Sequence, residues 1–334
     1  MHLKELGELK LIKLIRKLSL TTFNPQIKVG IGDDCSVFNN GIVVTTDAYL
    51  EDIHFVKDYF SYRNIGKRAV CATLSDIAAM AAEPIAIFIS ALLPKDLKEK
   101  YLIDLYAGIK TIAKMFRTQI AGGDLVNYPK LGLILTAIGK AKHPKLRSQV
   151  KAGDYLYLTG YCGISETGRL ALKFQLPQKE FMVAIKRHLT PIPRIYEALK
   201  LKKFIRGLID TSDGLSTDCY HLATESQVKL KIFYEKLPIH PETFKLQKLL
   251  AQSNKDLIFN LALNSGEDYE LLFSSPNDNL PKTIGNVKLT CIGKAERGRG
   301  VYLIKNNKEQ PLTPKGYDHF SYSNKSFSSE LNLF

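Results

Sequence analysis

The chain has 334 residues, more than one hydrophobic core normally holds, so two domains of about 150 residues each are expected. Its formal net charge is +14, but the basic residues are scattered along the sequence, which argues against a dedicated nucleic-acid surface. The five cysteines lie far apart with no C-x-x-C pair, which argues against a disulfide framework or zinc site and favours a reducing compartment.

No stretch of the sequence resembles a membrane anchor. The longest apolar runs, residues 85–93 and 131–138, fall well short of the ~20 residues that a membrane helix needs. Charged residues interrupt the leucines at the N-terminus, so no signal peptide is recognised. We therefore expect a cytoplasmic protein that contacts neither a membrane nor a nucleic acid.

The first part of the chain predicts a mixture of strands and helices. Leucine and isoleucine recur at helical spacing over residues 3–18, which predicts an amphipathic helix. Further along, helices are expected over 63–82 and 96–117, and strands over 42–47, 85–93, 119–124 and 131–139. This pattern is equally compatible with antiparallel and parallel pairing.

The second part begins after a polar, basic segment at 141–152, which we interpret as the connection between domains. Strands are expected over 155–159, 205–211, 287–294 and 301–304, helices from near Ser165 and over 212–226, a proline turn at 189–194 and a further apolar segment at 258–264. The fold class is therefore α+β or α/β. We expect an N-terminal domain over 1–142, a C-terminal α/β domain over 143–320 and a flexible tail over 321–334.

Acidic residues follow several apolar runs. The stretch GIGDDCSVF, residues 30–38, places Asp33 and Asp34 after two glycines, a pattern typical of a solvated turn or of a cation site. The runs IVVTTD, QIAGGD and GLID end at Asp47, Asp124 and Asp210, and strand ends are where ligands of α/β proteins commonly bind. This repetition suggests that the carboxylates converge.

Asp76 lies inside a helix of small residues, where an ionised carboxylate must be paired or bound to a metal. Its partner is either Lys67 or Arg68, or a cation. If the aspartates share one cleft, each close pair repels by roughly 1–4 kcal/mol, which Mg²⁺ bound together with substrate phosphates would offset. In the DTSDG segment, Ser212 or Asp213 either caps a helix or helps its N-terminus to bind a phosphate.

The sequence lacks several well-known catalytic motifs. It has no P-loop, no H-R-D or D-F-G triplet, and no G-x-G-x-x-G after a strand. His54 is the only histidine near the acidic motifs, and no spacing suggests a Ser-His-Asp or Cys-His arrangement. We expect no covalent nucleophile.

The combination of motifs resembles the thiamine-monophosphate kinase family, within the aminoimidazole ribonucleotide synthetase superfamily. The motifs GIGDDCSVF, TTDAYLEDIHF, ATLSDIAAMAAEP, GGD, KRHLTPIPR, DTSDGLSTD, SGEDYELLF and KGYDHF occur in that family's order over residues 25–320. The resemblance implies direct transfer of the ATP γ-phosphate to thiamine monophosphate, several Mg²⁺ ions and a homodimer. It also implies an N-terminal barrel built across the dimer and a layered C-terminal α/β domain.

The resemblance also implies roles for residues that match the family's motifs. The metal-binding positions match Asp34, Thr45, Thr46, Asp47, Asp76, Asp124, Asp210 and Asp213. The nucleotide contacts match Gly123, Asp124, Arg147 and Ser212, and the positions that hold the thiamine end match His54, Glu267 and Tyr317.

The chain departs from the family pattern at three places. Leu125 and Val126 follow GGD where threonine is common, Ser265 replaces a glycine, and Tyr317 stands where some relatives have tryptophan. An aromatic face for the cationic thiazolium remains.

Two alternatives stay open at this point. One is another ATP-using enzyme of the superfamily, such as aminoimidazole ribonucleotide or selenophosphate synthetase. The SGEDYEL and KGYDHF pair favours the thiamine enzyme. The other is a basic nucleic-acid-binding protein without catalysis, which leaves the aspartates unexplained.

Overall fold

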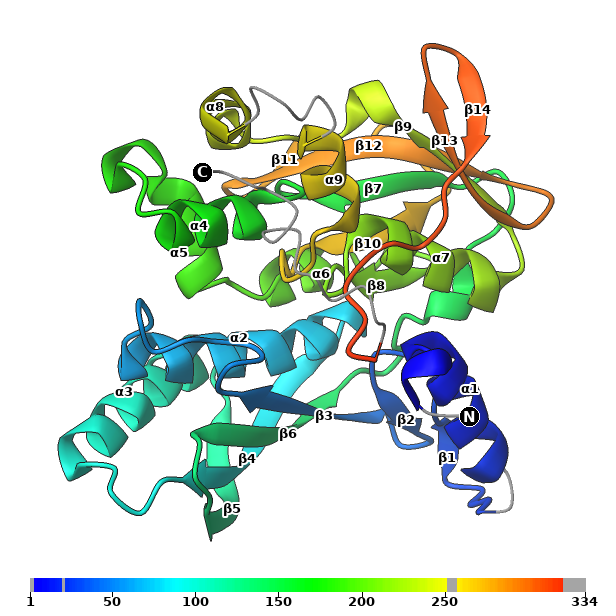
Figure 1. Cartoon of the computed structure of the whole chain (residues 1–334). Helices are drawn as coiled ribbons and strands as arrows, with labels where there is room; N and C mark the ends of the chain where they lie inside the picture. Colours follow the sequence, from blue (N-terminus) through cyan, green and yellow to red (C-terminus); the bar gives the residue numbers. More distant parts are fainter. Residues whose placement is uncertain (1–2, 20–21, 251–256, 321–334) are drawn as a thin grey trace.

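Two β-sheets, one from each half of the chain, lie on either side of a long helix (Figure 1). The computed structural model describes residues 3–19, 22–250 and 257–320. The first sheet has the order β1-β2-β3-β6-β4-β5. Its strands are β1 (Ile27–Val29), β2 (Ser36–Phe38), β3 (Ile42–Leu50), β4 (Glu83–Leu93), β5 (Gln119–Asn127) and β6 (Gly132–Lys140). Only β4 and β5 are paired in parallel in this sheet.

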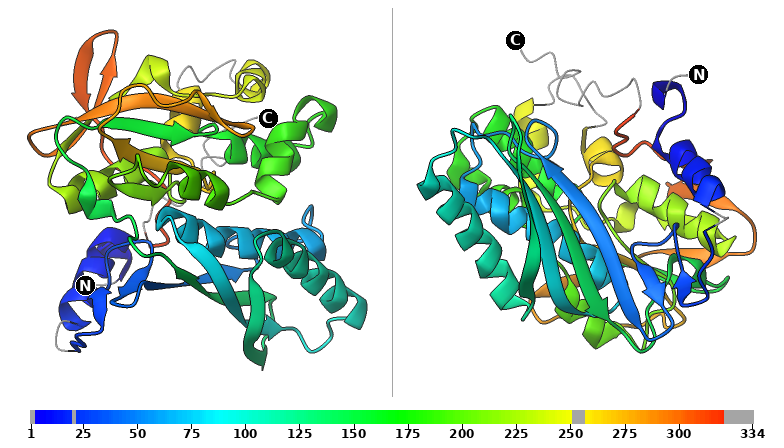
Figure 2. Two further views of the ribbon diagram at one scale, coloured as in Figure 1. Left: turned by 180° about the vertical axis from the view of Figure 1, so that it is seen from behind. Right: turned by 90° about the horizontal axis from the view of Figure 1, so that it is seen from below.

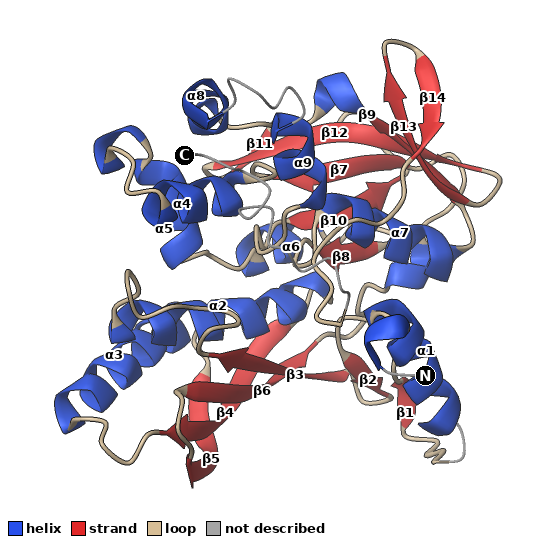
Figure 3. Cartoon of the chain, viewed as in Figure 1, coloured by secondary structure: helices blue, strands red, loops and turns tan. Residues whose placement is uncertain are grey.

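Helices α2 (Tyr62–Ala79) and α3 (Glu99–Met115) cover one face of the first sheet (Figure 3). Two glycines allow these helices to touch: a Cβ on Gly66 would lie 2.1 Å from the carbonyl oxygen of Leu105, and a Cβ on Gly108 2.0 Å from that of Arg63. No helix of the described residues lies on the opposite face of the sheet, as the view from below in Figure 2 shows.

The second sheet belongs to the C-terminal half. Its order is β14-β13-β9-β12-β7-β10-β8, with β11 paired to β12. The strands are β7 (Tyr155–Thr159), β8 (Leu208–Asp210), β9 (Lys229–Phe233), β10 (Leu271–Ser275), β11 (Thr283–Ile284), β12 (Val287–Glu296), β13 (Gly300–Lys305) and β14 (Lys308–Pro311). The helices are α4 (Ile164–Lys173), α5 (Met182–Leu189), α6 (Ile195–Leu201), α7 (Leu215–Ser226), α8 (Pro241–Leu250) and α9 (Leu257–Asn264).

One hydrophobic core joins the two halves. Ile65 and Leu74 of α2 belong to the same buried cluster as Leu208 of β8 and Phe273 of β10. Helix α2 is therefore packed on both sides, against the first sheet below and the C-terminal half above (Figure 1). This position carries Asp76, on the same helix, to the junction of the two halves.

The N-terminal helix is shorter than its periodicity predicts. A 3₁₀ turn (Leu3–Glu5) precedes α1 (Glu8–Leu18), and Gly7 between them has a φ of 69°, which breaks the helix. The carboxylate of Asp318 accepts a hydrogen bond from the Glu8 backbone nitrogen at 3.1 Å. The KGYDHF segment thus anchors the beginning of the chain, a contact that no local pattern indicates.

Most predicted elements are present, with shifted ends. The apolar segment at 258–264 is helix α9, and the sequence reasoning missed the strands β1, β9, β10 and β14 and the helices α5, α6 and α8. Each sheet lies wholly on one side of residue 142, although the domain boundary itself stays a prediction. The predicted tail at 321–334 lies outside the described residues. None of the helices within the described ranges is long and apolar enough to cross a bilayer.

Gly123 is required by the pairing of β4 with β5. A Cβ there would lie 1.8 Å from the carbonyl oxygen of Ile89, and its φ is +154°. We expect Gly123→Ala to lower the free energy of unfolding by about 1–3 kcal/mol, because the strands must separate. Chemical denaturation measures this, with Gly30→Ala as the control, since nothing lies within 4 Å of a Cβ at Gly30. Equal losses in both variants would contradict the steric reason.

Candidate active site

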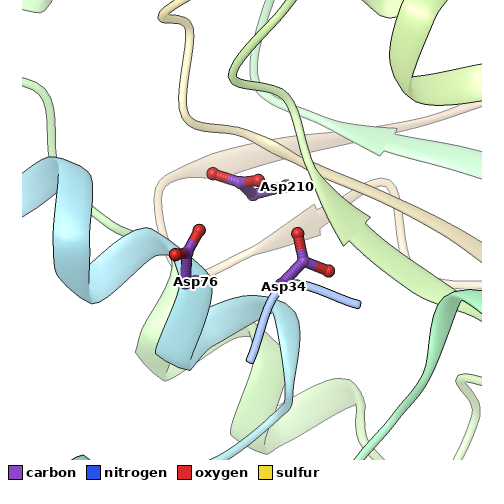
Figure 4. A group of neighbouring side chains, drawn as sticks. All are labelled: Asp34, Asp76 and Asp210. Carbon is purple, nitrogen blue, oxygen red and sulfur yellow. The ribbon is translucent and has the colours of Figure 1, made fainter. Parts of the chain in front are cut away.

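Three aspartates from distant parts of the sequence meet at the junction of the two halves. Asp34 comes from the loop before β2, Asp76 from the C-terminal part of α2, and Asp210 from the end of β8. One carboxylate oxygen of each lies within 4.8 Å of the others, and all three side chains point into the same space (Figure 4). This is the close group of carboxylates that a divalent cation requires.

Hydroxyl groups hold two of these carboxylates in place. Thr45 on β3 donates its Oγ1 hydrogen to Asp76 Oδ2 at 2.5 Å, and Ser75 donates to Asp210 Oδ2 at 2.6 Å. The other oxygen of Asp210, Oδ1, is buried and has no partner within the described residues. A buried carboxylate oxygen without a donor is costly, so a bound cation fits this position.

Arg147 is the cation that reaches the cluster. Its Nη2 and Nε donate to the two oxygens of Asp34 at 2.7 and 3.2 Å, and its backbone nitrogen donates to Asp33 Oδ2 at 3.0 Å. The segment 141–152, interpreted as the connection between domains, therefore supplies the Arg147 side chain to the cluster. One guanidinium cannot neutralise all the acids that surround it.

The electrostatics of the site favour a bound cation. Burial, and then repulsion by Asp47, raises the pKa of Asp76 well above its usual value. Burial and repulsion by Asp34 do the same to the pKa of Asp210 and raise the pKa of Asp33 to about 7. Burial also raises the pKa of Asp213 to about 6. Each of these shifts marks a carboxylate whose charge is poorly compensated by the protein alone.

These shifts predict a pH dependence of stability. The folded protein holds protons on Asp33 and Asp213 up to pH about 7 and about 6, whereas the unfolded chain releases them near pH 3.9. The free energy of unfolding of the metal-free protein should therefore fall as the pH rises through this window. Thermal unfolding in EDTA should give a lower Tm at about pH 8 than at about pH 5.5. Mg²⁺ should raise the Tm more at the higher pH, and a metal-free Tm that is higher at the higher pH would contradict the cluster electrostatics.

The alternation of β3 separates its three candidate residues. Thr45 and Asp47 face α2. The carboxylate of Asp47 accepts a hydrogen bond from Thr73 on that helix, and burial raises the pKa of Asp47. Thr46 is exposed on the opposite face, with its Oγ1 3.2 Å from that of Thr136. The side chain of Thr46 therefore points away from the aspartate cluster.

Gly123 and Asp124 do not join the cluster within one copy of the chain. They lie on β5, which is the edge strand, and two strands separate it from β3. The register pairs Asp124 with Ser90 and Gly123 with the buried Ile89. Asp124 therefore projects from the face that carries no helix. The departures Leu125 and Val126 are exposed on the same strand.

The DTSDG segment contributes carboxylates, and its backbone also hydrogen-bonds two other segments of the chain. Helix α7 begins after Gly214, and no side chain caps it, so the structure does not support the first of the two alternatives, a cap by Ser212 or Asp213. Instead, the carbonyl of Ser212 accepts from the Glu267 nitrogen at 2.7 Å, and that of Asp213 from the Tyr317 nitrogen at 2.9 Å. The segment thus binds the backbone of two residues that the resemblance matches to the thiamine end, Glu267 and Tyr317.

The residues expected at the thiamine end gather in one place. The Nδ1 atom of His54 accepts from the Leu50 nitrogen at 3.0 Å, and burial lowers the pKa of His54, so the ring is neutral with its proton on Nε2. His319 lies between His54 and Tyr317, with ring centroids 5.5 and 4.8 Å away. Glu267 is near enough to raise the pKa of both His54 and Tyr317.

Sequence reasoning missed the role of two residues of this region, His319 and Arg68. His319 had no pattern to mark it, whereas Asp33 had been named with Asp34 as part of a possible cation site. Arg68 was named only as one possible partner of Asp76, beside Lys67 or a cation, but its guanidinium pairs with Glu267 at 2.7 Å. A signal was available for Arg68, because it lies among small, buried residues of α2 where an arginine is out of place.

Comparisons with known proteins agree with this site. Residues 32–141 match the family model "AIR synthase related protein, N-terminal domain". The thiamine-monophosphate kinase of Aquifex aeolicus (strain VF5) is 33% identical over 325 residues, which cover 96% of this chain and 100% of that protein. That of Escherichia coli (strain K12) is 32% identical over 311 residues, covering 89% and 93%.

Solved structures share the whole fold. "AaThiL complexed with AMPPCP and TMP" superposes with a TM-score of 0.84 at 32% identity, covering 96% of this chain and 99% of that one. The HypE-HypF complex chain, at 20% identity and a TM-score of 0.71, is similar in fold alone.

The two sheets, the helix packed between them and the acidic cluster define a protein of the AIR synthase-related class. The expected two-part α/β architecture is confirmed. Within this class, the chain belongs to the thiamine-monophosphate kinase family, because identity above 30% extends over nearly the full length of both chains. The resemblance drawn from the motifs is thereby confirmed.

Proposed function

We propose that this protein transfers the γ-phosphoryl group of ATP directly to the phosphate of thiamine monophosphate. A terminal phosphate oxygen of the acceptor forms the new P–O bond, the bond to the β-phosphate oxygen breaks, and thiamine diphosphate and ADP leave. The observation that carries this proposal is the meeting of three carboxylates within 4.8 Å, one of them next to the segment whose backbone binds Glu267 and Tyr317, two residues proposed for the thiamine end. The related structure holding AMPPCP, an ATP analogue, together with TMP supports it.

The acidic residues would hold the metal ions. Asp34, Asp76 and Asp210 form the centre, with Asp47 and Asp213 close by. Mg²⁺ bound there would offset the repulsion between two phosphorylated molecules and stabilise charge on the transferred group. Arg147 would share Asp34 with the phosphates, and Ser212 would contact the nucleotide. No general base is needed, since the acceptor phosphate, with a second pKa of ~6, is already mostly ionised at neutral pH.

The thiamine end would be held by His54, Glu267 and Tyr317. Glu267 supplies the negative charge that a thiazolium cation needs, and Tyr317, 49% exposed, offers an aromatic face. The neutral His54 ring adds no positive charge that would repel the cation. Tyr317 and Asp213 share a backbone hydrogen bond, so the two ends of the substrate would lie on one connected frame.

We also propose a homodimer formed through the bare face of the first sheet. Phe88 and Ile134 on that face are 38% and 40% exposed although they are apolar, which is typical of a surface covered in an assembly. Asp124 lies on the same face, so it would act across the dimer and complete the site of the partner subunit. Light scattering should give twice the chain mass of 37.5 kDa. A monomer would contradict this proposal.

The decisive experiment is an assay of the purified protein with ATP, Mg²⁺ and thiamine monophosphate. Thiamine diphosphate and ADP should appear in equal amounts. Parallel reactions offer the acceptors of aminoimidazole ribonucleotide and selenophosphate synthetases, and turnover of one of these alone would overturn the proposal. A titration with duplex DNA tests the nucleic-acid alternative, which predicts binding that collapses with salt. The reaction would take place in the cytoplasm, which agrees with cysteines that form no disulfide among the described residues.

A further inference from the structure

Residues 265–270 of the C-terminal half form a segment with a strained backbone. This segment meets helix α2 of the N-terminal half. Glu267 and Tyr269 have φ values of 64° and 50°, a left-handed conformation that is unfavourable for residues with side chains. The intervening Asp268 accepts hydrogen bonds from two backbone nitrogens at the start of α4 at 2.6 and 2.9 Å. Glu270 is bound by two buried arginines. These anchors hold the strained backbone, which presents Glu267 and Tyr269 to α2.

Arg68 of α2 meets this segment from the other half. Its side chain is 0% exposed, and its Nη2 lies 2.7 Å from Glu267 Oε2. The rings of Phe60 and Tyr269 lie with their centroids 5.9 and 5.8 Å from the guanidinium carbon. Within the described residues, none of its three nitrogens, Nε, Nη1 and Nη2, makes a hydrogen bond of good geometry, so the contact with Glu267 is a close ion pair rather than an aligned hydrogen bond.

Stability alone does not account for this arginine. A buried guanidinium with unpaired N–H groups costs free energy, and a buried ion pair rarely repays the loss of hydration of both charges. The pair does, however, hold one oxygen of the Glu267 carboxylate against the guanidinium, while the Glu267 side chain is still 32% exposed. Oε2 faces Arg68, which leaves Oε1 available to a ligand.

We propose that Arg68 is a positioning residue for the thiamine end of the site, holding the Glu267 carboxylate where the cationic ring of the substrate binds. The proposal rests on the proposed role of Glu267. Arg68 itself does not touch the substrate. Because it belongs to α2 and Glu267 to the C-terminal half, the pair also sets the distance between the metal-binding carboxylate on α2 and the substrate-binding segment.

The test is a double-mutant cycle with Arg68→Met, Glu267→Gln and the combined variant, together with Arg68→Lys. Isothermal titration measures the Kd for thiamine monophosphate without ATP, and kinetics give kcat and both KM values. Arg68→Met should raise the Kd and KM for thiamine monophosphate about tenfold, the order of coupling expected within an ion pair, and leave the KM for ATP unchanged. The combined variant should bind no more weakly than Glu267→Gln, and Arg68→Lys should lie in between.

Additive losses in the combined variant, or an unchanged Kd in Arg68→Met, would overturn the positioning role. Where Arg68→Met does not fold, Arg68→Lys decides, because lysine keeps the charge but lacks the planar fork. An unchanged Kd in that variant counts against the proposal. A normal Kd in Glu267→Gln is a different failure, since it removes the proposed role of Glu267 itself.

Discussion

Asp76→Asn should reduce kcat by about a hundredfold or more while the protein stays folded. The change removes one of three carboxylates that lie within 4.8 Å of one another, so the proposed metal centre would lose a ligand whereas the shape of the side chain is kept. Steady-state kinetics with ATP and thiamine monophosphate measure the effect. Asp47→Asn should act in the same direction.

Asp104→Asn is the matched control for this prediction. Asp104 pairs with Arg63 on the surface and its side chain is 51% exposed, so its replacement should leave kcat within the error of the assay. The Tm of metal-free Asp76→Asn should exceed that of the wild type, because a buried carboxylate with a raised pKa costs stability when it ionises. Near-normal activity in both Asp76→Asn and Asp47→Asn would remove the metal-cluster interpretation.

Glu270→Gln should lower the free energy of unfolding by about 3–5 kcal/mol, which is the largest stability effect we expect. Glu270 is 1% exposed and accepts hydrogen bonds from Arg187, from Arg194 at 2.5 and 2.6 Å and from Thr159 at 2.7 Å. Without its charge, the largely buried guanidinium groups of Arg187 and Arg194 lose their close carboxylate partner, and among the described residues only Arg194 keeps a paired one, Glu197 at 4.0 Å. Their attraction lowers the pKa of Glu270 despite its burial, so the charge is present at neutral pH.

Glu296→Gln is the control for this stability measurement. Glu296 also pairs with a basic residue, Lys231, at 2.8 Å, but its side chain is 41% exposed. Its loss should change the free energy of unfolding by about 1 kcal/mol or less, as is usual for surface ion pairs. Urea denaturation of both variants gives the comparison, and similar losses would show that the buried network contributes no more than a surface pair.

The sequence predicted local features well and contacts between distant segments poorly. Apolar runs and helical periodicity located the strands around β3 and the helices α2 and α3, because these patterns record which face of an element is buried. It missed β9, although the buried Leu230 and Ile232 alternate with lysines as in a strand, and β10, whose residues are all buried and therefore show no alternation. It left open whether Ser212 or Asp213 caps α7, and the structure has Gly214 at that position.

The candidate site divides in the same way. Motif order named the candidate acids, and three of them, Asp34, Asp76 and Asp210, do meet. It could not say that Arg68 turns to Glu267, or that Asp124 lies on the other face of its sheet. Those outcomes depend on strand register and on the packing of α2, which no short stretch of sequence contains.

The sequence by itself determined the family, the kind of chemistry and the residue types that such chemistry needs, because each of these is written in local motifs. Tertiary structure alone decided which carboxylates lie close together, and that Arg68 of the N-terminal half contacts Glu267 of the C-terminal half. The physical reason is that α2 is buried against both halves, so one helix places Asp76 beside Asp210 and Arg68 beside Glu267.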